Sequence, residues 1–330
     1  MAVLVCGGAG YVGSHTVTEL ILRGYDAIVV DSLETGHRES VWPGAKFYEG
    51  DLRDDFFMEK VFRENKITSV IDFAAFSLVG ESVLNPMKYY ENNFYGALCL
   101  LKQMLKMDVR HIVFSSTAAT YGNPVSIPIL ETDPTEPINP YGETKLAVEK
   151  AFKWYDSAYG LKYAALRYFN VAGAHPSGKI GEDHRPETHL IPNVLRVAMG
   201  LDPAVKLFGG DYPTEDGTCV RDYIHATDLA DAHILAMEKL VADDCSSIYN
   251  LGNGKGFSNK QIIEMAKDVT GKRIPVEMAP RRHGDPPVLV ASSEKISRQL
   301  KWKPKFNTLD QIIQTAWQWH AAHPNGYGGK

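Results

Sequence analysis

The opening of the chain limits how it can fold. Residues 1–13 place a short β-rich run directly before glycines spaced as Gly8-x-Gly10-x-x-Gly13. Glycines in this spacing permit a tight turn between a strand and a helix, and they let a pyrophosphate approach backbone amides at the positive end of the helix. Gly7 adds an overlapping Gly-x-x-Gly-x-x-Gly pattern. The opening therefore favours a dinucleotide-binding strand–turn–helix unit over an ordinary glycine turn.

Short runs of apolar and β-branched residues alternate with helical stretches through the first half of the chain. The runs that indicate buried parallel strands are Val3–Cys6, Ala27–Asp31, Ser69–Phe73, His111–Ser115 and Tyr163–Arg167. The stretches that indicate helices between them are Gly13–Arg23, Asp54–Asn65, Pro86–Met107 and Tyr141–Tyr159. Repeated strand–helix units with right-handed crossovers predict an α/β fold built on a Rossmann-type, doubly wound parallel sheet.

The alternation stops after about residue 170. Residues 174–186 are rich in glycine, proline and charge, which is typical of a loop, and short elements follow up to an amphipathic helix near Thr308–His320. We predict a dinucleotide-binding domain at 1–172 and a smaller, mixed α/β substrate-binding lobe at 173–330. The boundary is soft, because the strand-like Ile248–Leu251 suggests that residues 222–252 pack back on the first domain.

Composition excludes several classes of protein. Hydrophobic residues make up 44% of the 330 and charged residues 23%, as in ordinary globular proteins. A net charge of -5 argues against nucleic acid as a partner, and no apolar run is long enough to span a membrane. Cys6, Cys99, Cys219 and Cys245 lie far apart, and the N-terminus lacks the pattern of a signal peptide. We therefore expect free thiols in a cytoplasmic protein.

An acidic residue ends the second expected strand, where dinucleotide-binding folds select their cofactor. Asp31 follows the glycines by about 20 residues, and a carboxylate there can hold a ribose 2′-hydroxyl and repel a 2′-phosphate. NAD is therefore predicted over NADP. Residues 50–52, Gly-Asp-Leu, are a candidate adenine contact, although a polar turn explains them equally well.

Tyr141 and Lys145 place a phenol and an ammonium four residues apart, on one face of an expected helix. A nearby ammonium stabilises a phenolate and lowers the pKa of the tyrosine. Moving that pKa from ~10 to near 7 takes roughly 4 kcal/mol and makes Tyr141 a general base at neutral pH. The alternative is a helix-start tyrosine after Pro140 beside a solvated lysine, and the glycine turn upstream favours the catalytic interpretation.

Thr117 comes at the end of the strand expected from His111, so its hydroxyl can emerge at the carboxyl edge of the sheet, where ligands bind. The hydroxyl can donate to a substrate oxygen and share its proton with Tyr141. Residues 115–117 could instead only cap the strand end. The Tyr141–Lys145 pair makes the catalytic interpretation preferable.

Arginines in the second lobe stand in neutral or acidic surroundings, notably Arg221 and the pair Arg281–Arg282. Arginine is the preferred bidentate partner of phosphate, and a diphosphate-bearing substrate needs such groups because the overall charge does not attract it. An ion pair between Arg221 and the neighbouring Asp222 is the structural alternative.

Three histidines, His175, His184 and His189, fall in the loop-like stretch. No His-Glu-x-x-His motif or comparable ligand spacing accompanies them. We interpret them as loop histidines and predict no metal.

Together these motifs resemble the extended short-chain dehydrogenase/reductase family, and within it the UDP-glucose 4-epimerase group. The resemblance covers essentially the whole chain. The segments that carry it are residues 7–15, Tyr89-Tyr-Glu-Asn-Asn, Phe114-Ser-Ser-Thr-Ala, Pro140-Tyr-Gly-Glu-Thr-Lys, Leu166-Arg-Tyr-Phe-Asn-Val-Ala-Gly-Ala-His-Pro-Ser-Gly, Asp211-Tyr-Pro-Thr-Glu-Asp-Gly-Thr, Val220-Arg-Asp-Tyr-Ile-His and Ala279-Pro-Arg-Arg-His-Gly-Asp. The later segments separate this group from other sugar-nucleotide enzymes.

The resemblance implies reversible C4 epimerisation of UDP-glucose and UDP-galactose through a 4-keto sugar. Tyr141 would take the 4-hydroxyl proton while C4 gives its hydride to tightly bound NAD, and the ketone would turn over before the hydride returns to its opposite face. Thr117 stands where the family more often has serine. Lys145 would lower the pKa of Tyr141 and hold the nicotinamide ribose. A homodimer through the helices near Pro86–Met107 and Tyr141–Tyr159 is also implied.

Binding residues follow from the resemblance by motif position. Those implied to line NAD are Gly7, Gly10, Tyr11, Val12, Gly13, Asp31, Ser32, Asp51, Leu52, Phe73, Ala74, Ala75, Asn92, Ser115, Tyr141, Lys145 and Phe169. Those implied to contact the UDP-sugar are Thr117, Tyr141, Asn170, His189, Leu190, Phe208, Arg221, Arg282, Asp285 and Leu289. Among these, Phe208 would face the uracil, Asp285 its ribose, and the arginines the phosphates.

Three positions depart from the family pattern. Ser77 stands where a lysine can lie near the cofactor, and His189 stands where an asparagine is common. Leu289 replaces the bulky tyrosine of some members. A smaller side chain there extends the expected substrates to UDP-N-acetylhexosamines.

Two other functions share parts of this pattern. A sugar-nucleotide 4,6-dehydratase typically carries Asp-Glu directly after the threonine, but Ala118-Ala119 follows Thr117 here. A cofactor-sensing binding protein often loses the reactive tyrosine or lysine, and this chain keeps both. The pattern therefore favours an epimerase.

Overall fold

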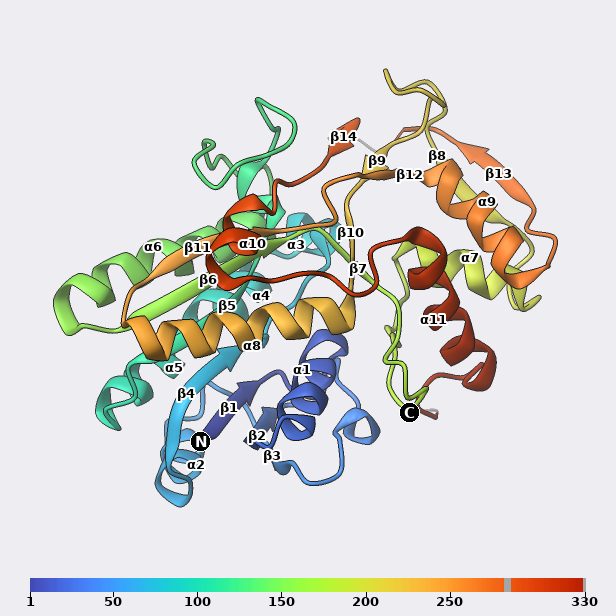
Figure 1. Cartoon of the computed structure of the whole chain (residues 1–330). Helices are drawn as coiled ribbons and strands as arrows, with labels where there is room; N and C mark the ends of the chain where they lie inside the picture. Colours follow the sequence, from blue (N-terminus) through green and yellow to red (C-terminus); the bar gives the residue numbers. More distant parts are fainter. Residues whose placement is uncertain (282–285, 329–330) are drawn as a thin grey trace.

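The computed structural model describes residues 1–281 and 286–328, and it is built around a seven-stranded parallel sheet (Figure 1). The strand order is β11-β6-β5-β4-β1-β2-β3. The strands are β1 (Ala2–Cys6), β2 (Asp26–Asp31), β3 (Lys46–Glu49), β4 (Ile67–Asp72), β5 (His111–Thr117), β6 (Lys162–Tyr168) and β11 (Ser247–Leu251). This architecture confirms the predicted fold class. The carboxyl ends of the strands share one edge, where a doubly wound sheet binds its ligands.

Helices cover both faces of the sheet because successive side chains of each strand point to opposite sides. Val3 and Val5 face a core that includes α1 (Tyr11–Leu22), α8 (Ala226–Asp243) and α10 (Glu294–Leu300). Leu4 and Cys6 face a second core, formed with α2 (Asp55–Glu64), α5 (Gly96–Lys106) and α6 (Pro140–Tyr159). Burial on both faces explains why the strands are continuous apolar runs.

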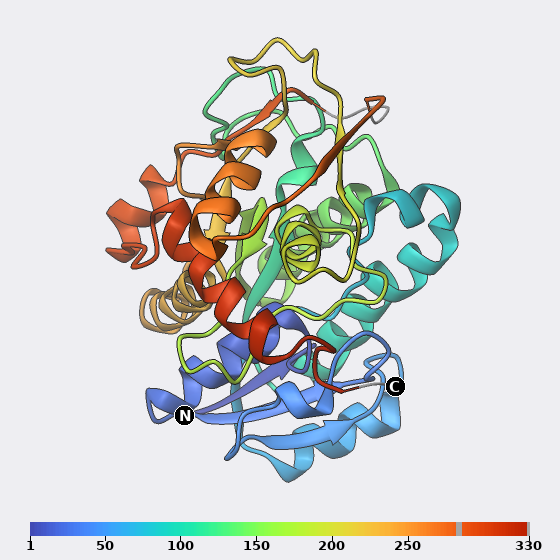
Figure 2. The ribbon, with the colours of Figure 1, turned by 90° about the vertical axis from the view of Figure 1, so that its right-hand side faces the viewer.

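The second lobe has its own hydrophobic core between helices and a small parallel pair of strands. Its helices are α7 (Leu190–Ala198), α9 (Asn259–Thr270) and α11 (Leu309–Ala322), and α9 packs against α11 (Figure 2). Its strands are β7 (Asn170–Ala172), β8 (Val205–Phe208), β9 (Val220–Arg221), β10 (Tyr223–His225), β12 (Phe257–Ser258), β13 (Val276–Ala279) and β14 (Val288–Leu289). None of the helices in the described part of the chain is long and apolar enough to cross a membrane.

Most predicted elements are confirmed within a few residues, with two differences. The expected single helix over Pro86–Met107 is instead α4 (Pro86–Tyr89), a π-helical turn (Tyr90–Tyr95) and α5. The edge strand β3 was missed, since its end residues are exposed and its pattern is short. The remaining short elements are α3 (Val79–Leu84) and the 3₁₀ turns Arg38–Ser40 and Ala118–Tyr121.

The chain returns from the second lobe to the first sheet. Strand β11 pairs in parallel with β6, with Ile248 opposite Ala165. Helix α8 also packs against α1. The division at residue 172 stays a prediction, since the segment after it supplies both a strand and a helix to the first unit.

A buried ion pair ties α6 to β6 of the sheet. Arg167 on β6 is 3% exposed and Glu149 on α6 is 1% exposed, and Arg167 Nε donates to Glu149 Oε1 at 2.9 Å. Arg167 Nη1 also donates to the hydroxyl of Tyr121 at 2.9 Å, and this hydroxyl donates to Asn250 Oδ1 at 2.6 Å. One polar network thus joins α6, β6, the turn after β5 and β11.

Replacing Glu149 by alanine should destabilise the fold strongly, because it leaves the guanidinium of Arg167 buried without its anion. We expect the free energy of unfolding in urea to fall by about 3–5 kcal/mol. Lys150→Ala, at the exposed neighbouring position of the same helix, should change it by no more than ~0.5 kcal/mol. Equal losses in the two variants would show that the network does not carry this stability.

Candidate active site

The turn after β1 lies tightly against the turn after β4, and glycine alone fits there. Gly7 has a φ of 72°, and a Cβ on it would lie 2.8 Å from the backbone nitrogen of Ala74. A Cβ on Gly13 would lie 2.1 Å from the carbonyl oxygen of Gly7. Gly10 caps α1 without a side-chain hydrogen bond, so the first amides of the helix lack a side-chain partner. Such a helix start is a site for an anion.

Asp31 at the end of β2 braces this turn. Its Oδ2 accepts from the backbone nitrogen of Ala9 at 2.9 Å, and its Oδ1 accepts from the backbone nitrogen of Leu33 at 2.9 Å. The carboxylate is therefore held at the carboxyl edge of the sheet, directly beside the glycine turn. Ser32, the next residue, is exposed.

The turn after β4 is fixed by a residue that sequence reasoning missed. Asn93 lies in the π-helical turn and is 2% exposed. Its Oδ1 accepts from the backbone nitrogen of Phe76, and its Nδ2 donates to the carbonyl oxygen of Phe76, both at 2.9 Å. Asn92 contacts it by donating to Oδ1 at 3.0 Å. The paired asparagines of Tyr89-Tyr-Glu-Asn-Asn were the available signal, and π-helical turns often mark functional sites.

Tyr141, Lys145 and Thr117 converge at the end of β5. Asn139 caps α6 by accepting from the backbone nitrogen of Gly142 at 2.9 Å, which sets the first helical turn that carries Tyr141. The Tyr141 and Thr117 side chains are hydrogen-bonded. Lys145 is buried, and its Nζ donates to the carbonyl oxygen of Ser115 at 2.8 Å. The three candidate catalytic residues therefore belong to one group.

Burial governs the electrostatics of this group. It lowers the pKa of Lys145 to about 8, although the negative charges of Asp72 and Glu149 oppose the shift. Burial also raises the pKa of Tyr141, and the hydrogen bond with Thr117 opposes that shift. The structure differs here from the expectation that Lys145 lowers the pKa of Tyr141, because desolvation of the phenol dominates and the ammonium donates to a backbone carbonyl.

Tyr168 connects the reacting group to the second lobe, and it was not predicted. Its hydroxyl is hydrogen-bonded to the hydroxyl of Ser115, and burial raises its pKa. Two residues later Asn170 begins β7, where its backbone nitrogen donates to the carbonyl oxygen of Asp222 at 3.1 Å. Phe169 lies between the two and is partly buried.

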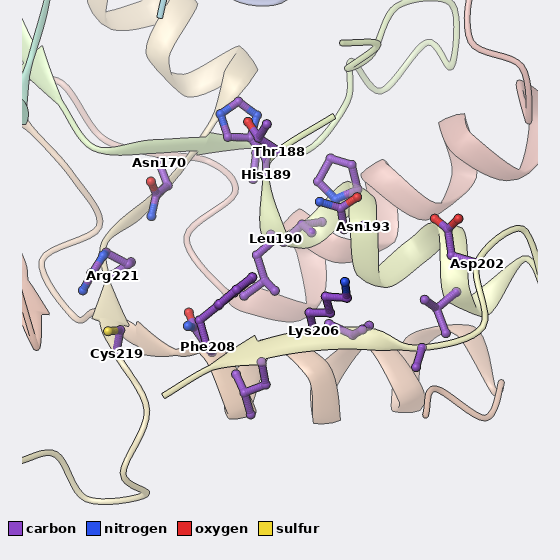
Figure 3. Close-up of a pocket in the computed structure, with 18 of the residues that line it drawn as sticks. Asn170, Thr188, His189, Leu190, Asn193, Asp202, Lys206, Phe208, Cys219 and Arg221 are labelled. Carbon is purple, nitrogen blue, oxygen red and sulfur yellow. The ribbon is translucent and has the colours of Figure 1, made fainter. Parts of the chain in front are cut away.

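A cavity of about 610 Å³ lies where β7 leads into the second lobe (Figure 3). Its volume is in the range of small-molecule sites. Figure 3 shows Asn170 and Arg221 toward one end, Lys206 and Asp202 toward the other, and Leu190 and Phe208 between them. Five predicted substrate residues line it, namely Asn170, His189, Leu190, Phe208 and Arg221. Thr188, Asn193, Lys206 and Cys219 also line it and were missed.

The other predicted residues in the described part of the chain do not line this cavity. Leu289 on β14 stands opposite Arg221 on β9, so it is adjacent to a lining residue. Arg282 and Asp285 fall outside the described residues. Tyr11 donates to the carbonyl oxygen of Gly173 at 2.5 Å, Asp51 is paired with Arg53, and Leu52 is part of the core. Val12 packs on the α1 side of the sheet, and Phe73 contacts the ring of His233. Ala75 is partly buried, and Ser77 is exposed.

The histidines of the loop-like stretch are not equivalent. His175 pairs with Glu19 at 3.4 Å. His184 and His189 instead meet Glu182 and Glu187, and the ligand atoms of these four residues all lie within 4.8 Å of one another. The structure therefore groups residues that could hold a metal, which the sequence spacing had not indicated.

Comparisons with known proteins agree with this geometry. Residues 3–252 match the NAD dependent epimerase/dehydratase family. The chain is 59% identical to a UDP-glucose 4-epimerase from Halalkalibacterium halodurans, over 99% of this chain and 98% of that protein. It is 56% identical to a UDP-glucose 4-epimerase from Lacticaseibacillus casei, over 100% of both. The solved UDP-glucose 4-epimerase from Bifidobacterium longum, in complex with NAD⁺ and UDP, is 40% identical with a TM-score of 0.92, over 99% of this chain and 100% of that chain.

Gly13→Ala should empty the dinucleotide site, because the added Cβ would force the glycine turn away from α1. We expect the NAD content of the purified protein, measured after denaturation, to fall at least ~10-fold, which is about 1.4 kcal/mol in affinity. Gly80→Ala is the control, since a Cβ at Gly80 meets nothing within 4 Å. Full NAD content in Gly13→Ala with normal circular dichroism would contradict the assignment of this turn.

Proposed function

The chain belongs to the NAD dependent epimerase/dehydratase family, and on this premise we propose that it interconverts UDP-glucose and UDP-galactose. The reaction is a reversible inversion at C4 through a 4-keto sugar, with NAD held throughout the cycle. One observation carries the proposal: Tyr141, Thr117 and Lys145 meet at the carboxyl end of β5, on the same sheet edge as the glycine cradle, and a cavity that contains Arg221 opens shortly after β6.

The residues at the sheet edge suit NAD. The close approach of Gly13 to Gly7 leaves room for a pyrophosphate over the first amides of α1, and Asp31 suits the hydroxyls of the adenosine ribose. Lys145 would hold the second ribose. NAD, when bound there, supplies a reversible hydride acceptor beside the sugar. The other residues that the family resemblance assigns to NAD binding are also part of this proposal.

Tyr141 handles the proton of the sugar 4-hydroxyl. It accepts this proton as the ketone forms and returns it to O4 as the ketone is reduced on its opposite face. Tyr141 is thus the phenolate at the beginning and end of each cycle and the phenol only while the ketone exists, so the burial that raises its pKa works against the state that starts the reaction. Thr117 shares the proton through its hydrogen bond with Tyr141. In this proposal the ammonium of Lys145 offsets only part of the desolvation that raises the pKa of Tyr141.

The cavity residues hold the nucleotide end of the substrate. Arg221, Asn170 and His189 provide donors for the diphosphate, and Leu190 and Phe208 provide an apolar wall for the uracil. Arg282 and Asp285 complete this proposal from sequence similarity alone. The two-residue step from Tyr168 to Asn170 keeps the diphosphate donors close to the reacting group.

Elimination of water is not supported. Ala118 and Ala119 begin the 3₁₀ turn directly after Thr117, and neither side chain can act as the acid or base that a 4,6-dehydratase requires. A cofactor-sensing role without chemistry is also disfavoured, because such a role needs neither a buried lysine nor a tyrosine hydrogen-bonded to a threonine.

We also propose a homodimer in the cytoplasm, acting in galactose metabolism. Both helical segments implied in dimerisation expose large apolar side chains: Met87 is 67% exposed and Trp154 is 75% exposed. Burying such side chains favours association. Light scattering on the purified protein in solution should give twice the mass of one chain, which is 36.6 kDa.

The purified protein, without added NAD, should convert UDP-galactose to UDP-glucose. No net oxidation should accompany turnover, because the hydride removed from C4 returns to it. Chromatography of the sugar nucleotides measures the conversion. Stoichiometric accumulation of reduced cofactor would indicate a dehydrogenase, and a 4-keto-6-deoxy sugar would indicate a dehydratase.

Tyr141→Phe should lose most activity, by ~10²–10⁴-fold in kcat, because it removes the group that transfers the proton. Bound NAD and the far-UV circular dichroism should stay normal. Tyr159→Phe, an exposed tyrosine on the same helix, is the matched control and should keep full activity. Near-normal turnover by Tyr141→Phe would remove Tyr141 from the mechanism.

Leu289 should influence which sugars are accepted, since it stands beside Arg221 in the paired strands. A leucine leaves more room than a tyrosine for a C2 acetamido group, so weak activity on UDP-N-acetylglucosamine is expected. Leu289→Tyr should lower kcat/KM for this substrate relative to UDP-glucose, whereas the volume-conserving Leu289→Met should not. An unchanged ratio in Leu289→Tyr would mean that Leu289 is only a core contact.

A further inference from the structure

Four potential metal ligands come together in the loop between β7 and α7. Glu182, His184, Glu187 and His189 each offer one nitrogen or oxygen atom, and these atoms lie within 4.8 Å of one another. Three of the four do not line the cavity, and His189 does. The cluster is therefore a feature of its own at the border of the cavity.

The distances in the cluster are close to those of a tetrahedral metal site. His184 Nδ1 lies 3.2 Å from Glu182 Oε1 and 3.6 Å from Glu187 Oε2, and His189 Nδ1 lies 3.5 Å from Glu187 Oε1. Bonds to zinc of about 2.0–2.2 Å separate tetrahedral ligand atoms by roughly 3.3–3.6 Å. His189 Nδ1 lies 2.6 Å from Glu182 Oε1, so this pair needs to open by about 1 Å.

Charge and hydrogen bonding also favour a cation in the cluster. The Glu182 side chain is 3% exposed and the Glu187 side chain 10%, and in the described part of the chain the ion pairs of both are with His184 and His189. The Nδ1 atom of His184 is buried without a well-formed hydrogen bond. Two carboxylates, two neutral imidazoles and one divalent cation sum to zero charge, which lowers the cost of burial.

We propose that Glu182, His184, Glu187 and His189 bind one divalent transition-metal cation, with Zn²⁺ as the best fit. Two imidazole nitrogens and two carboxylate oxygens suit Zn²⁺, whereas Mg²⁺ and Ca²⁺ prefer oxygen ligands alone. Four protein ligands leave no open position, so the site is structural. This proposal is independent of the proposed function.

The metal would close a loop that the chain already holds from its other side. Asp183 Oδ2 accepts from the backbone nitrogen of Tyr327 at 3.0 Å, and the Tyr327 hydroxyl accepts from the backbone nitrogen of Gly181 at 2.9 Å. His189 is the N-cap residue of α7. A cation bound through its Nδ1 would fix the start of α7 and leave Nε2 of the ring for the cavity.

The test measures metal, not turnover. The full chain, free of any affinity tag, is treated with a chelator, dialysed and titrated with Zn²⁺. Bound zinc is determined by elemental analysis, and affinity is determined by competition with a chromophoric chelator. The wild type should bind about one Zn²⁺ per chain, and its thermal midpoint should rise with Zn²⁺.

His184→Asn should lower the affinity for Zn²⁺ at least ~100-fold. Loss of a residue that only supports a metal ligand costs up to about 100-fold, and His184 is proposed as a ligand itself. His111→Asn is the matched control, because His111 lies at the start of β5 and pairs with Asp244, which is not one of the four proposed ligands. Its affinity and its thermal response should equal those of the wild type. Glu187→Gln should lose affinity in parallel, which keeps the test decisive if His184→Asn folds poorly.

Two outcomes would overturn the proposal. One is a wild type that retains no zinc after dialysis at micromolar free Zn²⁺. The other is equal affinity in the wild type, Glu187→Gln and His111→Asn, which would place any bound zinc elsewhere on the chain. In either case the four side chains are two histidine–carboxylate ion pairs that need no metal.

Discussion

The close contact between the turns after β1 and β4 is the constraint on which the rest of the site depends. Gly7 lies against Ala74, and Gly13 lies against Gly7, at separations that exclude any side chain. Because β1 stands between β4 and β2 in the sheet, this contact also fixes the edge at which Asp31 emerges. The helix start, the carboxylate and the ends of β4 and β5 therefore face one space. The packing of the backbone alone therefore shapes a binding site for a dinucleotide.

Sequence reasoning succeeded where the signal is local. The glycine turn, the buried strands and the Tyr141–Lys145 spacing are each set within a few residues, and the structure has them close to where they were predicted. It failed where distant segments meet. Asn93 pins the turn at Phe76, and Tyr168 meets Ser115, across separations of 17 and 53 residues. No periodicity carries such information. Among the cavity residues, Arg221 was a candidate from its charge surroundings, and the family resemblance supplied the other predicted ones.

The sequence predicted neither the histidine cluster nor the raised pKa of Tyr141, and the two reasons are related. A sequence gives the identity of charged neighbours but not the degree of burial. Lys145 is four residues from Tyr141, yet burial raises the pKa of the phenol while the ammonium donates to Ser115. Likewise the spacing from Glu182 to His189 fits no helical metal motif, because an irregular loop brings these ligands together. Desolvation and loop shape are tertiary properties, and both need coordinates.

A two-residue step leads from the end of β6 at the reacting group to the start of the cavity lining at β7. From Tyr168, bonded to Ser115 beside Lys145, to Asn170 at the cavity, the extended backbone covers roughly 7 Å. Asn170 is then held by the carbonyl oxygen of Asp222, the residue directly before β10. In the proposed reaction, a substrate anchored by its diphosphate in the cavity would be positioned against Tyr141 by this short, paired segment rather than by a flexible linker. Turning of the ketone would then occur about the bonds of the substrate, since the pairing of β7 with β10 holds the segment between the two halves of the site.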